Sequence, residues 1–127
     1  MLHNSPLIAF VATSNSEEAL RFYRGTLGLT LVEDSPFALV FSAGETTIRV
    51  QKVPQVASAQ FTALGWAVQD IEKTIAWLTA RGLAFERFPG MEQSDTGVWQ
   101  SPSGASIAWF RDPDGNILSL TQHGQTE

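Results

Sequence analysis

Residues 110–120 read Phe110-Arg111-Asp112-Pro113-Asp114-Gly115-Asn116-Ile117-Leu118-Ser119-Leu120, which is typical of a strand, a tight turn and a second strand. Pro113 presets its φ angle for the second position of a type I turn, and Gly115 supplies the left-handed residue from which a strand resumes through a bulge. Because side chains alternate along a strand, Leu118 and Leu120 share one face and Ser119 lies on the other. We expect a helix to cover the leucine face and Ser119 to face away from the helices.

Length and composition indicate a single globular domain. The chain has 127 residues, of which 43% are hydrophobic and 17% charged, and it contains no cysteine, which excludes disulfides, thiolate metal sites and a cysteine nucleophile. The net charge of −5 offers no basic stripe for nucleic acid or for a membrane surface. The apolar run near the N-terminus is too short to span a membrane and has no basic region before it. A cytoplasmic protein without nucleic-acid or membrane partners is therefore expected.

Two helix patterns divide the chain into similar halves. Apolar spacing predicts one helix over 16–27 and a second over 71–81. The first has two possible capping boxes, Ser14 with Glu17 or Asn15 with Glu18, and Asp70 is placed to cap the second. Strands are predicted over 7–13, 29–33, 39–42 and 46–53 in the first half, and over 61–68, 83–88, 98–100, 106–110 and 117–121 in the second.

The order of these elements repeats with an offset of 55 residues, which indicates an internal duplication. Each half is then a strand, a helix and three further strands, and the second half contains the short strand 98–100 in addition. We expect a single domain in which module 1 covers about 5–53, a hinge about 54–60 and module 2 about 61–123. Residues 89–97 form the longest segment without a clear pattern, and a flap is the expectation there.

This arrangement, together with the turn at 112–116, resembles the vicinal oxygen chelate superfamily, which includes glyoxalases, bleomycin-resistance proteins and extradiol dioxygenases. The segments 20–23 and 27–29 are similar to its usual first-half signature, and 117–120 to its usual end. The resemblance implies an α+β fold of two βαβββ modules, which form an incomplete barrel around a cleft with the helices outside. It also implies a homodimer.

Catalytic members of this superfamily hold a divalent metal at four positions, which the resemblance places at Ile8, Arg49, Ala63 and Ser119. None is an imidazole or carboxylate, the ligands that such ions need. The chain has two histidines. His3 lies before the first strand and on the opposite face from Ile8, and His123 shares the face of Ser119 but lies about 13 Å further along the strand. We therefore expect no metal and no other cofactor, with a relocated metal site as the less favoured alternative.

The face of the sheets that carries these positions predicts a binding site of a different kind. Arg49 can bind a carboxylate or other anion through paired hydrogen bonds; alternatively, it pairs with Glu45 or Glu33 or extends into solvent. Small residues at 63, 65 and 67 would leave room for a ligand. The candidate ligand-binding residues are Arg49, Ser119, Thr47, Gln51, Phe10, Thr121, Trp99 and Trp109.

Aromatic side chains would wall the cleft and stack on a planar ligand. Trp99, Trp109, Phe37 and Phe41 are the candidates, although an aromatic residue in a sheet more often belongs to the core. Neither a nucleophile with a base nor a pair of carboxylates can be placed on the inner face, so no catalytic residue is assigned.

The sequence thus favours a metal-free protein that binds a planar or anionic small molecule, in the manner of the bleomycin-resistance proteins. The alternative is a lyase or dioxygenase of glyoxalase type with a displaced metal or a metal-independent mechanism. A structural or regulatory protein with an empty cleft is a third possibility.

Overall fold

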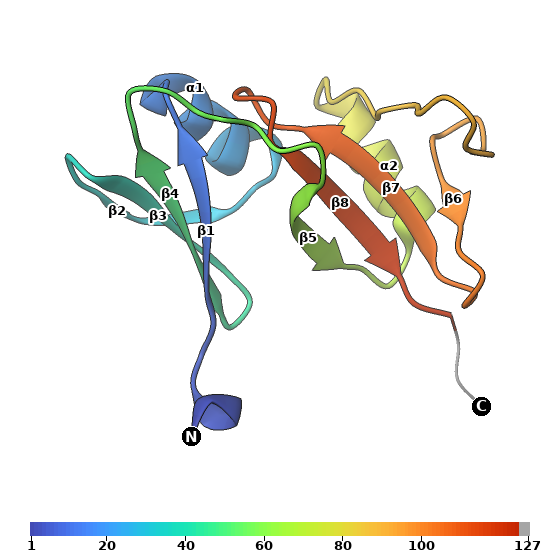
Figure 1. Ribbon diagram of the computed structural model, residues 1–127, viewed down its shortest axis with the longest axis horizontal. Helices are drawn as coiled ribbons and strands as arrows, with labels where there is room; N and C mark the ends of the chain where they lie inside the picture. The colour runs from blue at the N-terminus through green and yellow to red at the C-terminus, as the bar shows by residue number, and fades with distance from the viewer. Residues whose placement is uncertain (125–127) are drawn as a thin grey trace. The chain divides into compact units, whose positions relative to one another are not determined.

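The computed structural model describes residues 1–124 (Figure 1). The described residues form two compact units: Met1–Ser58 with Pro113–Gly115, and Ala59–Asp112 with the residues from Asn116 to Gly124. Each unit contains one four-stranded sheet. None of the helices within the described residues has the length and apolar content that a membrane span requires.

The first unit is built around a mixed sheet. Its elements are a 3-10 turn η1 (Leu2–Asn4), β1 (Ile8–Thr13), α1 (Ser16–Leu20), a π-helical segment η2 (Arg21–Thr26), β2 (Thr30–Asp34), β3 (Ala38–Ala43) and β4 (Thr46–Lys52). The strand order is β1-β4-β3-β2, with β1 parallel to β4 and the other pairs antiparallel.

The second unit repeats this plan. It contains β5 (Thr62–Ala67), α2 (Ile71–Ala80), β6 (Trp99–Gln100), β7 (Ser106–Arg111) and β8 (Ile117–Gln122), in the sheet order β5-β8-β7-β6. As in the first unit, the strand before the helix runs parallel to the last strand. The expected α+β class with βαβββ modules is thereby confirmed, and within the described residues neither four-stranded sheet closes on itself.

The buried residues of the two sheets follow different patterns. In β4 alternate residues, Ile48 and Val50, are buried, whereas in β8 all residues of Ile117–Leu120 are buried, which includes the leucine face of Leu118 and Leu120. Helix α2 packs on β8, so the expected burial of the leucine face is confirmed. In Figure 1, α2 lies behind the sheet formed by β7 and β8.

Asn15 is the N-cap of helix α1. Its side-chain oxygen accepts a hydrogen bond from the Glu18 backbone amide at 3.2 Å, and the Asn15 backbone amide donates to Thr13 Oγ1 at 3.1 Å. Ser14 has a different role, because its amide and its hydroxyl both donate to Asp114 Oδ1, at 2.8 and 2.9 Å. The turn residue Asp114, which belongs to the first unit, thereby fixes the backbone immediately before the helix.

The first helix differs from the expected regular α-helix over 16–27. After Leu20 it continues as η2, where the Leu27 amide donates to the Phe22 carbonyl, five residues earlier. The apolar spacing predicts the length of a helix, but it does not distinguish a π-helix, with hydrogen bonds between residues five apart, from an α-helix, in which they are four apart. Gly28 follows with a φ of 78°, and the Leu29 amide closes the end on the Tyr23 carbonyl.

The strand expected over 83–88 was wrong. No strand forms over 83–88, although the Glu86 amide donates to the Trp109 carbonyl of β7 at 2.8 Å. The Gln93 side chain supplies further hydrogen bonds to this segment. The Gln93 amide group accepts from the Phe88 N–H and donates to the carbonyls of Glu86 and Gly97, at 2.8, 3.0 and 2.8 Å.

The segment expected to form a flap is held by hydrogen bonds. Arg87 donates to the Ser94 and Gln93 carbonyls at 2.8 and 3.1 Å. Gln93 also forms an isolated bridge with Trp99. Nearby side chains thus hold the backbone carbonyls of Gln93, Ser94 and Gly97 in this loop.

Candidate functional site

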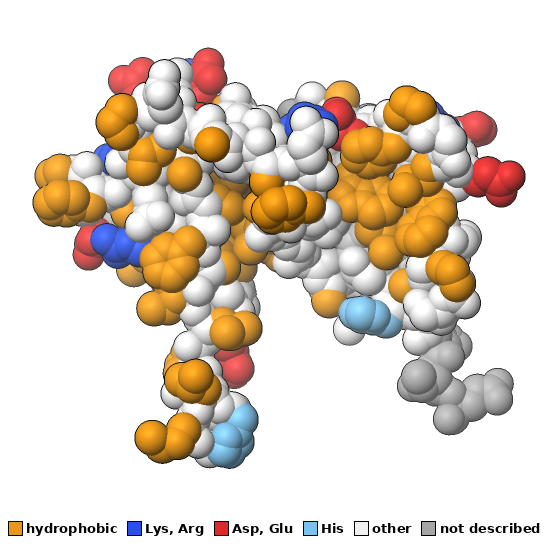
Figure 2. All heavy atoms as spheres, in the orientation of Figure 1, with side chains coloured by type: hydrophobic (Ala, Val, Ile, Leu, Met, Phe, Trp, Pro, Cys, Tyr) orange, Lys and Arg blue, Asp and Glu red, His pale blue; other side chains and the backbone are white. Residues whose placement is uncertain are grey.

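The helix-free face of the first unit presents the predicted residues of β1 and β4 side by side. The register pairs Ile8 with Thr47, Phe10 with Arg49 and Ala12 with Gln51. Ile8 and Phe10 are 56% and 54% exposed. Figure 2 shows hydrophobic side chains along this N-terminal part of the chain. We call this surface, formed by Phe10, Val40, Thr47, Arg49 and Gln51, the Arg49 face.

Arg49 occupies the centre of the Arg49 face. Phe10 flanks it on β1 and Val40 on β3. Neither of the acids considered as its partners lies close. Glu33 pairs with Val40 and is therefore two strands away, about 10 Å, while Glu45 lies four residues earlier, about 13 Å along an extended strand. In the described part of the chain, no hydrogen bond or ion pair joins the Arg49 side chain to another residue.

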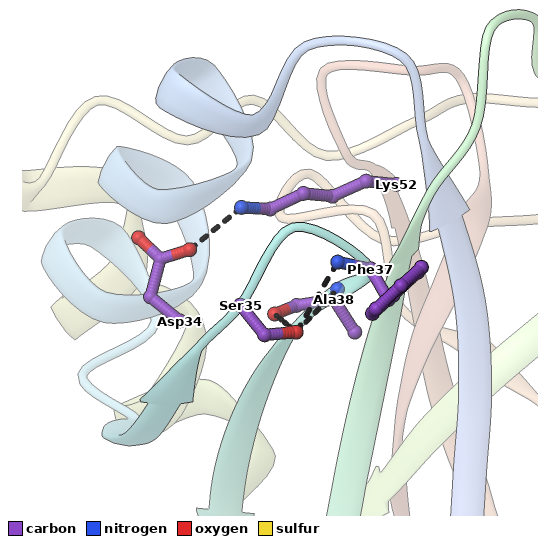
Figure 3. A network of polar contacts seen from close by, with 5 residues as sticks. All are labelled: Asp34, Ser35, Phe37, Ala38 and Lys52. Carbon is purple, nitrogen blue, oxygen red and sulfur yellow. Dashed lines mark hydrogen bonds and ion pairs between the residues drawn. The ribbon is translucent and has the colours of Figure 1, made fainter.

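The neighbouring cation of β4 is engaged. Lys52 Nζ lies 2.6 Å from Asp34 Oδ1, next to the turn where Ser35 Oγ accepts from the Phe37 and Ala38 amides (Figure 3). This pair neutralises Lys52 within the protein. The guanidinium of Arg49 therefore retains its capacity to bind an anion from outside the chain.

The second unit presents the remaining predicted residues on the corresponding face of its own sheet. The register aligns Trp109, Ser119 and Gly65 in one row across β7, β8 and β5. Thr121 lies in the next row, between Ile107 and Ala67, and Ile107 in turn pairs with Trp99. We call the surface formed by Gly65, Ala67, Trp109, Ser119 and Thr121 the Ser119 face.

Trp109 is held in place from several sides. Its indole N–H donates to Thr62 Oγ1 at 3.1 Å. Phe88 meets it edge to face with ring centroids 5.6 Å apart, and Trp99 lies 6.1 Å away at a tilt of 41°. The ring is partly exposed, so it provides a fixed aromatic wall on which a planar ligand can stack.

Trp99 also borders a hollow at the end of its strand. The hollow has a volume of about 390 Å³, and its lining includes Trp99, Gln93 and two exposed acids, Glu72 and Glu92. Both oxygens of Glu72 accept from the Thr96 hydroxyl, at 2.7 and 3.1 Å. The lining is therefore acidic and differs in charge from the Arg49 face.

The four positions that the family resemblance assigns to a metal do not fit a divalent ion. Ile8 and Ala63 have no donor atom, Arg49 is a cation, and Ser119 offers one hydroxyl. Ala63 also sits in a register irregularity between Thr62 and Leu64, where it has no paired partner on β8. Among residues 1–124, no group of three or more His, Asp or Glu side chains is arranged to hold a metal ion. His3 and His123 are both exposed.

Two of the aromatic candidates do not lie on these faces. Phe41 is fully buried and packs against Tyr23 with ring centroids 5.7 Å apart, so it is a core residue of the first unit. Phe37 is 74% exposed in the turn between β2 and β3.

Sequence reasoning missed three residues that support the candidate surfaces: Thr62, Phe88 and Gln93. Thr62 holds the Trp109 ring, Phe88 packs on it, and Gln93 fixes the segment that carries Phe88. The aromatic character of Phe88 was a visible signal. The roles of Thr62 and Gln93 depend on side-chain hydrogen bonds between distant residues, which no local pattern indicates.

Comparison with known proteins identifies relatives over most of the chain. The family model of the Glyoxalase/Bleomycin resistance protein/Dioxygenase superfamily matches residues 7–120. Comparison with curated protein sequences returned no match.

Several solved structures have the same fold. TnmS3, an antibiotic binding protein from Streptomyces sp. CB03234, is 25% identical with a TM-score of 0.74, covering 98% of this chain and 99% of its own. A glyoxalase family protein from Enterococcus faecalis is 21% identical with a TM-score of 0.74, covering 96% and 100%. A lactoylglutathione lyase from Agrobacterium tumefaciens is 16% identical with a TM-score of 0.72, covering 94% and 93%. The latter two likenesses concern the fold alone.

Proposed function

Because the chain belongs to the Glyoxalase/Bleomycin resistance protein/Dioxygenase superfamily, we propose that it binds a planar or anionic organic molecule without a metal. The observation that carries this proposal is the Arg49 guanidinium, which has no protein partner within the described residues and lies on an exposed sheet face between Phe10 and Val40. A similar structure, TnmS3, is described as an antibiotic binding protein, which supports binding rather than turnover.

Arg49 supplies the charge for this binding. A guanidinium forms two parallel hydrogen bonds with a carboxylate and remains protonated in any environment that a protein offers. Phe10 and Val40 give the guanidinium apolar neighbours, which lower the competition from water. Thr47 and Gln51, on the same strand and the same face, provide further hydrogen-bonding groups. The proposed ligand of this face is therefore an organic acid with an apolar body.

The tryptophans of the second unit supply stacking surface for a planar ligand. Trp109 has a fixed orientation because Thr62 holds its indole N–H. Trp99 extends the aromatic surface, and Ser119 and Thr121 contribute hydroxyl groups beside it. This combination suits a flat ring with polar substituents.

Ligand titration monitored by thermal unfolding tests the proposal. The probes are 2-naphthoate and its neutral analogue 2-naphthamide, and a ligand at 100 times its Kd stabilises the folded protein by about 2.7 kcal/mol. Arg49→Gln should weaken 2-naphthoate binding about tenfold or more, since hydrogen bonds to a charged group contribute about 1.5–3 kcal/mol. It should leave 2-naphthamide binding unchanged. Arg24→Gln, an exposed position on η2, is the matched control.

A failure of both wild-type titrations would contradict the binding function. If instead the purified protein carried one equivalent of Zn, Ni, Mn or Fe and EDTA abolished a lyase or dioxygenase activity, the enzyme alternative would replace it.

We further propose a cytoplasmic homodimer, as the family resemblance implies. Light scattering of the eluted protein should then give twice the 13.9 kDa of one chain, and a monomeric mass would reject the dimer.

A further inference from the structure

Ser119 combines burial with an unused hydroxyl. The residue is only 7% exposed. Within residues 1–124, its hydroxyl forms no hydrogen bond with another group. The hydroxyl itself is not a fully enclosed atom, so a group from outside the chain can form a hydrogen bond with it. The residues around the hydroxyl decide which groups can reach it.

Gly65 lies directly beside the Ser119 hydroxyl. The two residues are paired across β5 and β8, and a Cβ atom added to Gly65 would stand 2.5 Å from Ser119 Oγ. Gly65 itself is exposed. The hydroxyl is therefore accessible on the Ser119 face because residue 65 has no side chain.

The space next to this hydroxyl is bounded by small residues and by an aromatic wall. Ala67 follows Gly65 on the same face of β5, and both are exposed. On the opposite side of Ser119, Trp109 is its paired neighbour on β7. A flat ring can therefore lie over the small residues of β5 with its edge at Ser119 and with Trp109 beside it.

From this arrangement we propose that Gly65 and Ser119 select a ligand with an oxygen acceptor, such as a carbonyl, on the edge of its planar ring. Ser119 donates its proton to that oxygen, because the proton has no protein acceptor among the described residues. Gly65 is the specificity-determining residue, since any side chain there displaces the Ser119 hydroxyl. This inference rests on the proposed small-molecule-binding function and specifies the ligand class.

Two probes that differ only in the carbonyl group test this inference. They are 9-fluorenone-2-carboxylate and fluorene-2-carboxylate, titrated against the wild-type chain with tryptophan fluorescence as the readout. One neutral hydrogen bond corresponds to roughly a three- to tenfold difference in Kd. The wild-type protein should prefer the fluorenone by that factor.

Ser119→Ala and Gly65→Ala should each abolish the preference and leave the affinity for fluorene-2-carboxylate within about twofold of the wild type. The double variant should show no further loss, because both changes remove the same hydrogen bond. Gly25→Ala is the matched control, since a Cβ atom there meets nothing within 4 Å. It should keep the preference.

The outcomes separate this inference from the proposed function. If the wild-type protein binds neither probe nor the naphthalene probes, the binding function is wrong and the inference with it. If it binds both fluorene compounds but shows no preference, or if Gly65→Ala keeps the preference, then the inference about Gly65 and Ser119 is wrong while the binding function stands. A melting temperature for each variant within a few degrees of wild type verifies that it is folded.

Discussion

Replacing Asp114 by Ala should destabilise the protein through the loss of two hydrogen bonds. Asp114 Oδ1 accepts from the Ser14 amide at 2.8 Å and from the Ser14 hydroxyl at 2.9 Å, immediately before the Asn15 cap of α1. Hydrogen bonds to a charged group contribute about 1.5–3 kcal/mol when buried. Because Ser14 is exposed, we take about 1–1.5 kcal/mol for each and expect a loss of about 2–3 kcal/mol.

Thermal unfolding followed by circular dichroism measures this loss. At an unfolding entropy of about 2.1 cal/mol/K per residue, 1 kcal/mol corresponds to about 4 °C in a chain of this length. Asp114→Ala should therefore lower Tm by about 8–12 °C. Ser14→Ala removes the hydroxyl bond alone and should lower Tm by about 4 °C.

A double-mutant cycle identifies the interaction. In the Asp114→Ala background, Ser14→Ala should cost almost nothing, because its acceptor is already gone. A Tm for Asp114→Ala within 2 °C of the wild type would refute the reasoning. Full additivity of the two changes would also refute it, since it would show that the two side chains do not interact.

Three further predictions concern single side chains. Asp70→Ala removes the acceptor of the Lys73 amide at the start of α2 and should cost about 1 kcal/mol in urea unfolding; an unchanged midpoint would contradict this. Gln93→Ala strips hydrogen-bond partners from Phe88 and its neighbours, and hydrogen exchange at the Phe88 amide should accelerate at least tenfold, whereas unaltered protection would show that other groups hold the segment. Lys52→Met breaks a pair with Asp34 whose side chains are 23% and 49% exposed, so stability should fall by 1 kcal/mol or less and the difference should shrink in high salt; a larger loss would mean that the pair is less exposed to solvent than the structure indicates.

The hairpin at 106–122 illustrates what local sequence predicts well. Pro113 and Gly115 define the turn, and Gly115 has the left-handed φ of 85° that the pattern implies. The alternation correctly predicts that the face of Leu118 and Leu120 is buried, whereas the burial of Ser119 on the other face does not follow from it. The turn and the leucine face depend on residues close together in the sequence.

The errors arise where distant residues decide the outcome. The segment 83–88 has strand-like composition, but the Gln93 side chain, and not a neighbouring strand, forms hydrogen bonds with the Phe88 amide and the Glu86 carbonyl. Two capping boxes were possible before α1. The Ser14 hydroxyl does not cap the helix, because it donates to Asp114, which lies 100 residues later in the sequence. The register shift at Ala63 in the pairing of β5 with β8 likewise cannot be predicted from the residues next to it in the sequence.

The candidate site was predictable in chemistry more than in detail. The residues at the four metal positions are visible in the sequence, and strand alternation predicts which residues of each strand share a face with them. The pairing of Phe10 with Arg49 and of Gly65 with Ser119 is known only from the structure. Whether Arg49 is engaged by an acid depends on distances across the sheet, which alternation does not provide. The relation of Gly65 to the Ser119 hydroxyl likewise required the side-chain position.

Calorimetric titration of 2-naphthoate into chelator-treated protein tests the central claim most directly. We predict saturable binding with an affinity that neither EDTA nor added Zn²⁺, Ni²⁺, Mn²⁺ or Fe²⁺ changes, because the proposed site uses the Arg49 guanidinium, and not a metal ion, as its positive charge. Binding that disappears after chelation and returns with one equivalent of metal would contradict it.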